Sequence, residues 1–112
     1  EAWTVAVNGH GTGIHAPGHQ SNTEPYIVGH SLILAHAAAA KIFKKEFAHQ
    51  NGLIGISNCG DFRYPLTDRD HDAAQRAMLF QMGWFTDPFF FGDYPSEMRE
   101  RLGDRSPIFS SE

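Results

Sequence analysis

Histidine and carboxylate side chains gather near the start of the chain, in a loop that is rich in glycine. His10, His15 and His19 follow one another at steps of five and four residues, and Glu24 comes shortly afterwards. Imidazole and carboxylate groups bind zinc when three or four of them are held in a fixed frame. The spacing matches no strong zinc motif, so we predict no metal site and keep a small metal-binding module as a rival hypothesis.

A carboxylate that could do acid–base chemistry opens the chain. Glu1 is followed by Ala2 and by the aromatic Trp3. A positioned carboxyl group can protonate a leaving oxygen and later take a proton from water. Taken alone, Glu1 is more simply a solvated surface residue, so the residues behind it decide between the two interpretations.

Composition narrows the classes of protein. The 112 residues are 41% hydrophobic and carry a formal charge of −4, with scattered Lys and Arg, which excludes a basic nucleic-acid surface. Cys59 is the single cysteine, so no intrachain disulfide can form. The longest apolar stretch, 32–40, is interrupted by His36 and is too short to cross a bilayer, so we expect no membrane partner. The chain begins without Met, so its location is open, with the cytoplasm slightly favoured.

The first half of the chain should contain one strand and one helix. Residues 1–7 alternate in the manner of a strand end or turn, and a long Gly-rich loop covers 8–25. A helix is predicted over 26–49, capped by Thr23 or Asn22 and ended by Asn51-Gly52. Its apolar face is expected at Val28, Leu32, Ala35, Ala39, Phe43 and Phe47.

The second half repeats this order. The apolar run 53–57 predicts a strand buried on both faces, followed by a loop and a helix over 68–84. Residues 85–95 should be irregular, 96–102 a short helix capped by Ser96, and the rest of the chain to residue 112 a loop. The order βαβα predicts an α/β fold with a parallel sheet. Two strands cannot cover such helices, so an incomplete domain is expected.

Four sequence motifs follow one another in the same order and at the same spacing as in a known family. They are Glu1-Ala2-Trp3 through Gly9, Gly11 and Gly13 to Ala16-Pro17-Gly18; Tyr26 to Ala37; Ile54-Gly55-Ile56 with Asn58 and Pro65; and Gly83-Trp84-Phe85 with Asp87-Pro88 and Gly92 to Pro95. Together they resemble glycoside hydrolase family 1, the family of retaining β-glucosidases. Ala2 departs from the family pattern, which has Pro after the glutamate. The resemblance covers essentially the whole chain.

The resemblance implies a fold and an activity. The fold is a partial (β/α)8 TIM barrel, with residues 1–112 supplying about two βα units of one catalytic barrel domain: the end of strand 4, helix 4, strand 5 and helix 5. The activity is hydrolysis of a β-glycoside or oligosaccharide by double displacement, without a metal or organic cofactor. A family member that binds sugars but has lost turnover is the alternative, and a nucleophilic glutamate near strand 7 would distinguish the two.

The resemblance also assigns roles to residues. Glu1 matches the family's acid/base, and Trp3 matches an aromatic that lines the aglycone subsite, with a core Trp as the alternative. Asn8 and His15 match loop positions at the aglycone mouth, Asn58 leaves strand 5 toward the same subsite, and Phe62 is a weaker candidate for its wall. No nucleophile is assigned, because the remaining glutamates match no catalytic position and are expected to be solvated: Glu24, Glu46, Glu97, Glu100 and Glu112.

Overall fold

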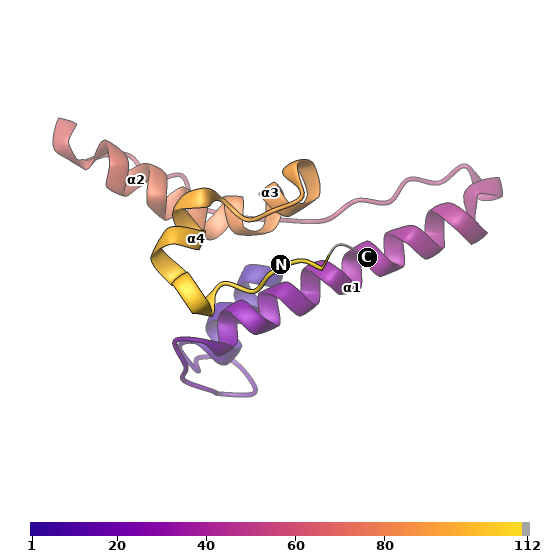
Figure 1. Cartoon of the computed structure of the whole chain (residues 1–112), viewed down its shortest axis with the longest axis horizontal. Helices are drawn as coiled ribbons and strands as arrows, with labels where there is room; N and C mark the ends of the chain where they lie inside the picture. Colours follow the sequence, from indigo (N-terminus) through magenta and orange to yellow (C-terminus); the bar gives the residue numbers. More distant parts are fainter. Residues whose placement is uncertain (111–112) are drawn as a thin grey trace.

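The computed structural model describes residues 1–110 and consists of helices joined by loops (Figure 1). The α-helices are α1 (Glu24–Glu46), α2 (His71–Met78), α3 (Trp84–Phe91) and α4 (Ser96–Leu102). Short helical turns of π or 3-10 geometry lie at Thr4–Gly9, Ala48–Gln50, Asp68–Asp70, Leu79–Gly83 and Gly103–Arg105. Glu112 lies outside the described residues.

Of the two predictions for the start of the chain, a strand end or a turn, the structure shows the turn, because Thr4–Gly9 is π-helical. The turn satisfies its own backbone, since the N–H groups of Gly11 and Thr12 both donate to the carbonyl of Val7 at 2.8 Å. A strand would need a neighbouring strand for the same groups. The turn packs beside α1 and buries Ala6 completely.

The predicted long helix is confirmed as α1, but its cap and its buried face differ from the prediction. Ser21 Oγ accepts hydrogen bonds from the backbone N–H groups of Thr23 and Glu24, at 3.2 and 3.1 Å, whereas Thr23 makes no side-chain cap. The buried residues of α1 are Pro25, Gly29 and Ile33, one position away from the predicted stripe. The stripe is displaced because Gly29 lets the ring of Trp84 approach the helix backbone.

By length and composition alone, α1 could also cross a bilayer. The core helix of a soluble protein passes the same test. Within the described residues 11% of the apolar window of α1 is buried, through Gly29 and Ile33, which pack against the core cluster. We therefore interpret α1 as one of the packing helices of the fold.

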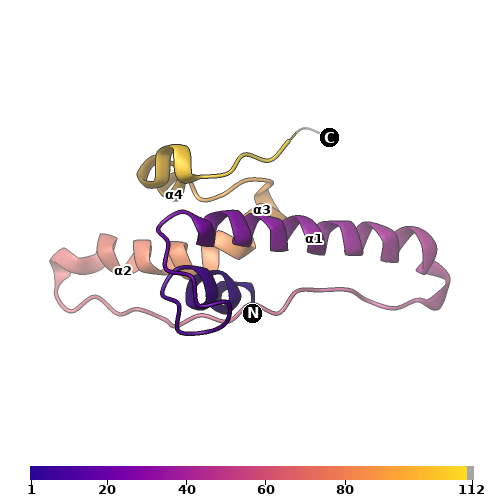
Figure 2. The ribbon, with the colours of Figure 1, turned by 90° about the horizontal axis from the view of Figure 1, so that it is seen from below.

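The apolar run 53–57 is extended but belongs to no sheet among residues 1–110. It runs in the opposite direction to α1 as an extended segment (Figure 2). Leu53 is fully exposed, and Ile54 and Ile56 remain 37% and 40% exposed. A strand needs at least one neighbouring strand to share its backbone hydrogen bonds, and the described part of the chain places none beside this segment.

The second helical region extends further than the sequence indicated. The predicted helix over 68–84 is confirmed as a 3-10 turn and α2, but 85–91 continues as α3 instead of being irregular. The π-helical turn Leu79–Gly83 joins α2 to α3, and Gly92, at φ 81°, ends the helix. The short helix α4 is confirmed, but its first turn closes on the Pro95 carbonyl and not on Ser96.

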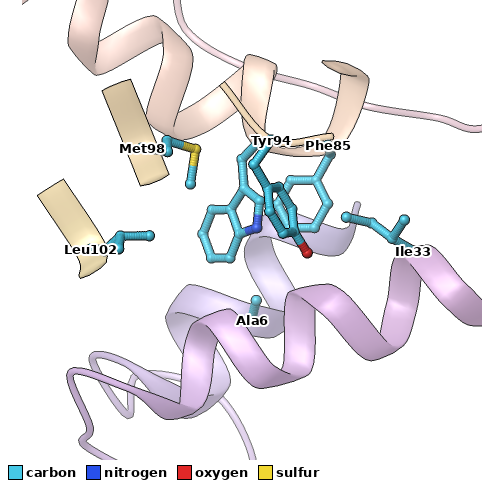
Figure 3. Packing of buried hydrophobic residues seen from close by; sticks show 7 residues of the cluster. Ala6, Ile33, Phe85, Tyr94, Met98 and Leu102 are labelled. Carbon is cyan, nitrogen blue, oxygen red and sulfur yellow. The ribbon is translucent and has the colours of Figure 1, made fainter. Parts of the chain in front are cut away.

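The core lies where α3, α4 and the N-terminal turn meet α1 (Figure 3). Trp84 and Phe85 stack with ring centroids 4.7 Å apart and are 3% and 1% exposed. The other buried apolar residues of this cluster are Ala6, Ile33, Tyr94, Met98 and Leu102. The chain is elongated, with a radius of gyration of 15.7 Å, against about 13 Å expected for a compact domain of this length.

Candidate functional site

Glu1 lies at the rim of an open hollow of about 440 Å³. Three segments form the hollow: the N-terminal turn, the middle of α1 and the extended run 53–57. Besides Glu1 it is lined by Thr4, Leu32, His36, Ile56 and Ser57, among others. His36 also packs edge-on against Phe89, with ring centroids 5.0 Å apart. An exposed carboxyl group beside an open hollow is accessible to a ligand.

The predicted site residues Trp3, Asn8 and His15, all near the start of the chain, occupy different environments. Trp3 is half-buried against the core cluster, as in the core interpretation of this residue. Asn8 is half-buried and His15 is exposed. The His15 backbone N–H donates to the Asn8 carbonyl at 3.0 Å, so the fold holds these two residues together at the stem of one loop.

Asn58 and Phe62 do not line the hollow at Glu1, although Asn58 follows Ser57, which does. Asn58 Nδ2 donates a hydrogen bond of 3.3 Å to the Phe85 carbonyl, which ties the second loop to α3. Phe62 lines a different hollow of about 490 Å³ that is formed mainly by α2 and the turn after it. Among the five predicted site residues, all of which the structure describes, only Glu1 lines the 440 Å³ hollow.

A cluster that the sequence spacing did not favour forms between the first loop and α1. His10 Nδ1 and His19 Nδ1 lie 3.4 and 2.8 Å from Glu24 Oε2. The hydrogen bond from His19, and then that from His10, hold the pKa of Glu24 below its usual range. Glu24 was expected to be solvated, and it keeps 44% of its side chain exposed but also makes these two hydrogen bonds. The sequence placed these residues in one loop together with His15, but their spacing did not show which of them would meet.

Glu97 likewise differs from the solvated group that was expected. It accepts from Arg101 Nε at 3.0 Å and from Arg76 Nη1 at 3.2 Å. Hydrogen bonds from Arg101, first, and Arg76 lower the pKa of Glu97. Glu46 and Glu100 are exposed, as predicted.

His30 has a structural role in the packing of α1. Its Nδ1 shares a hydrogen bond of 2.7 Å with the Tyr94 hydroxyl, and its ring lies 4.6 Å from that of Phe109. Burial, and secondly the charge of Arg99, lower the pKa of His30. Burial also raises the pKa of Tyr94. The pair links α1 to the segment before α4 and belongs to the packing of the fold.

The sequence matches the family described as Glycosyl hydrolase family 1 over residues 1–112. The chain belongs to this family. Beta-glucosidase 34 of Oryza sativa subsp. japonica is 46% identical over 125 residues, which cover 98% of this chain and 24% of that protein. The chain thus spans about a quarter of the length of the curated relatives that it matches.

Solved structures agree with the sequence match. The β-glucosidase of Trichoderma harzianum is 46% identical, with a TM-score of 0.96 over 99% of this chain and 24% of that one. A mutant rice β-glucosidase, solved in a covalent complex with Glc, is 46% identical with a TM-score of 0.95, over 99% of this chain and 26% of that one. These neighbours are β-glucosidase barrels, so the predicted fold class, part of a (β/α)8 TIM barrel, is confirmed.

Proposed function

We propose that the complete polypeptide carrying this chain is a retaining β-glycosidase that acts on β-glucosides, with Glu1 as its acid/base. Membership of the family supports the reaction class. Glu1 supports the assignment from this chain, because it is a carboxyl group with solvent access at an open hollow. The covalent complex of a rice relative with Glc is the kind of intermediate that double displacement requires.

In this mechanism Glu1 works in two steps. The protonated carboxyl group gives its proton to the glycosidic oxygen while a second carboxylate attacks the anomeric carbon and the glycosidic bond breaks. The Glu1 carboxylate then takes a proton from water, and the water oxygen displaces the enzyme carboxylate from the sugar. The products are the free sugar, with its configuration retained, and the aglycone. No metal or organic cofactor takes part.

The second carboxylate must come from another part of the polypeptide. The two carboxyl groups of a retaining enzyme lie about 5–5.5 Å apart. Among the described residues, Glu1 is the one carboxyl group that lines its hollow, and Glu24 and Glu97 are engaged elsewhere. We therefore propose that residues 1–112 are one part of a single catalytic barrel domain. The apolar run 53–57 would pair with neighbouring strands there.

The aglycone side of the site is proposed from the positions of four residues. Asn8, in the π-helical turn after Trp3, and His15, on the loop that follows this turn, are joined through their backbones. Trp3 is not fully buried, so part of its indole can face a sugar or aglycone. Asn58 already donates one amide N–H to Phe85, which leaves its second amide N–H and its carbonyl oxygen for a role in binding. The substrate class that fits is a small β-glucoside or oligosaccharide.

Replacing Glu1 by Gln in the complete polypeptide tests the assignment. Glu1→Gln keeps the shape of the side chain but removes the transferable proton, and should lower the hydrolysis of an aryl β-glucoside by about 10²–10⁴-fold. Glu46→Gln, an equal change at an exposed position of α1, should leave the rate unchanged. Unchanged hydrolysis by Glu1→Gln would overturn the assignment. A wild-type polypeptide that binds the glucoside without cleaving it would identify a non-catalytic family member.

A further inference from the structure

We propose that His10, His19 and Glu24 form a binding site for a divalent transition-metal ion of the zinc class. The ligand atoms of the three residues all lie within 4.8 Å of one another. The two imidazole rings meet edge to face, with centroids 5.4 Å apart, and both direct Nδ1 at the same carboxylate oxygen. The inference is independent of the glycosidase proposal.

The donor set selects the kind of ion. Two imidazole nitrogens and one carboxylate oxygen are a ligand set that zinc uses, with a water molecule as the fourth ligand. Neighbouring ligands of a tetrahedral zinc ion lie roughly 3.3 Å apart, given bonds of about 2.0–2.1 Å. The 3.4 Å separation of His10 Nδ1 from Glu24 Oε2 lies near this value. The 2.8 Å separation of His19 Nδ1 from the same oxygen is a hydrogen-bond length, so the exposed His19 side chain would move back by roughly half an ångström to admit the ion. Calcium and magnesium prefer all-oxygen sites, so they fit the cluster poorly.

The backbone already holds the three ligands in place. His10 follows the π-helical turn, and the His19 backbone N–H donates to the Gly9 carbonyl at 3.0 Å, next to His10. Glu24 is the first residue of α1, and its N–H donates to Ser21 Oγ at 3.1 Å. Little backbone ordering therefore remains to be done when a metal binds, and such preorganisation favours affinity.

Exposure of the ligands indicates what the ion would do. The side chains of His19 and Glu24 are 54% and 44% exposed, whereas that of His10 is 21% exposed. An ion can reach the cluster from solvent, and bound water can complete its coordination. Because the ligands come from both ends of the loop 10–24, the ion would clamp this loop onto the start of α1. The clamp would stabilise the fold without taking part in chemistry.

Metal titration of the complete polypeptide tests the site. The protein is used without a histidine tag and in a Cys59→Ser background, because the exposed Cys59 thiol could also bind zinc. Zn²⁺ binding is measured by calorimetry, and Co²⁺ serves as a visible-absorption probe of the coordination geometry. His10→Gln and His19→Gln should each weaken binding by about tenfold or more. The matched control is His15→Gln, an exposed histidine of the same loop that lies outside the cluster.

The outcomes separate a metal site from a hydrogen-bonded cluster. The proposal is supported if the wild type binds one Zn²⁺ ion, His10→Gln and His19→Gln lose it, and His15→Gln keeps it. Zinc should then also raise the melting temperature of the wild type and of His15→Gln but not that of the two cluster variants. Binding by both cluster variants equal to wild type, or equal loss in His15→Gln, would overturn the proposal. Melting temperatures without metal show whether each variant is folded. Glu24→Gln keeps both histidines but removes the carboxylate ligand, so this fourth variant should also bind Zn²⁺ more weakly than wild type.

Discussion

The contact between Gly29 and Trp84 gives a sharp prediction about the packing of α1. A Cβ atom at Gly29 would lie 2.7 Å from Trp84 Cζ2 and 3.0 Å from Cε2, both inside ordinary contact distance. Trp84 is 3% exposed, so its ring has little room to retreat. Overpacking of this kind costs about 1–3 kcal/mol. The better helix propensity of Ala offsets about 1 kcal/mol, which leaves Gly29→Ala destabilising by up to ~2 kcal/mol.

A double-mutant cycle isolates this contact. Stability is measured by urea unfolding of the complete polypeptide for wild type, Gly29→Ala, Trp84→Phe and the double variant. Phe lacks the ring atoms that meet the new methyl group, so in the Trp84→Phe background Gly29→Ala should become neutral or stabilising. The two changes should therefore be non-additive, as expected for residues in contact. Stabilisation by Gly29→Ala in the wild-type background would refute the packing argument.

Two further predictions concern pH and the chain by itself. Burial and the Arg99 charge hold the pKa of His30 below 6.5 in the folded chain, so on acidification the unfolded chain is protonated at His30 before the folded chain is. Neutral His30 therefore makes its full contribution to folding stability above pH 6.5. This contribution is lost as the pH falls from 6.5 toward the pKa of His30 in the folded chain. His30→Gln should therefore make the melting temperature depend less steeply on pH below the unfolded-state value of 6.5, and an unchanged slope would contradict the assignment. Residues 1–112 alone, with Leu53 fully exposed, should be inactive and show no cooperative thermal transition; a sharp transition would show otherwise.

Local signals predicted part of the fold well. The apolar periodicity over 26–49 predicted α1, which ends at Glu46, and Asn51, at φ 52° in the left-handed region, ends the 3-10 turn Ala48–Gln50 that follows it. The helix at 96–102 followed in the same way. Family motifs predicted the barrel, which the solved β-glucosidases confirm. In each case the deciding information lies within a few residues or in an ordered set of motifs.

Other features depend on contacts between distant residues and could not be predicted. The Phe-rich run after Trp84 suggested irregular structure, but packing of Phe85 into the core extends the helix through it. The apolar run 53–57 has the composition of a strand, but strand pairing needs partners that the described residues do not supply. The meeting of His10, His19 and Glu24 depends on how a long loop folds back, which residue spacing does not specify.

The role of Glu1 is tested most directly by rescue with azide. Without its proton-transfer group, the Glu1→Gln polypeptide should form a glycosyl-enzyme from an activated aryl β-glucoside but fail to pass it to water, because water needs a base and azide does not. The account predicts that azide restores release of the aryl alcohol and yields the β-glucosyl azide, with Glu46→Gln unaffected. An inactive Glu1→Gln variant that azide leaves inactive, or one that hydrolyses the glucoside as fast as wild type, would contradict the assignment of Glu1.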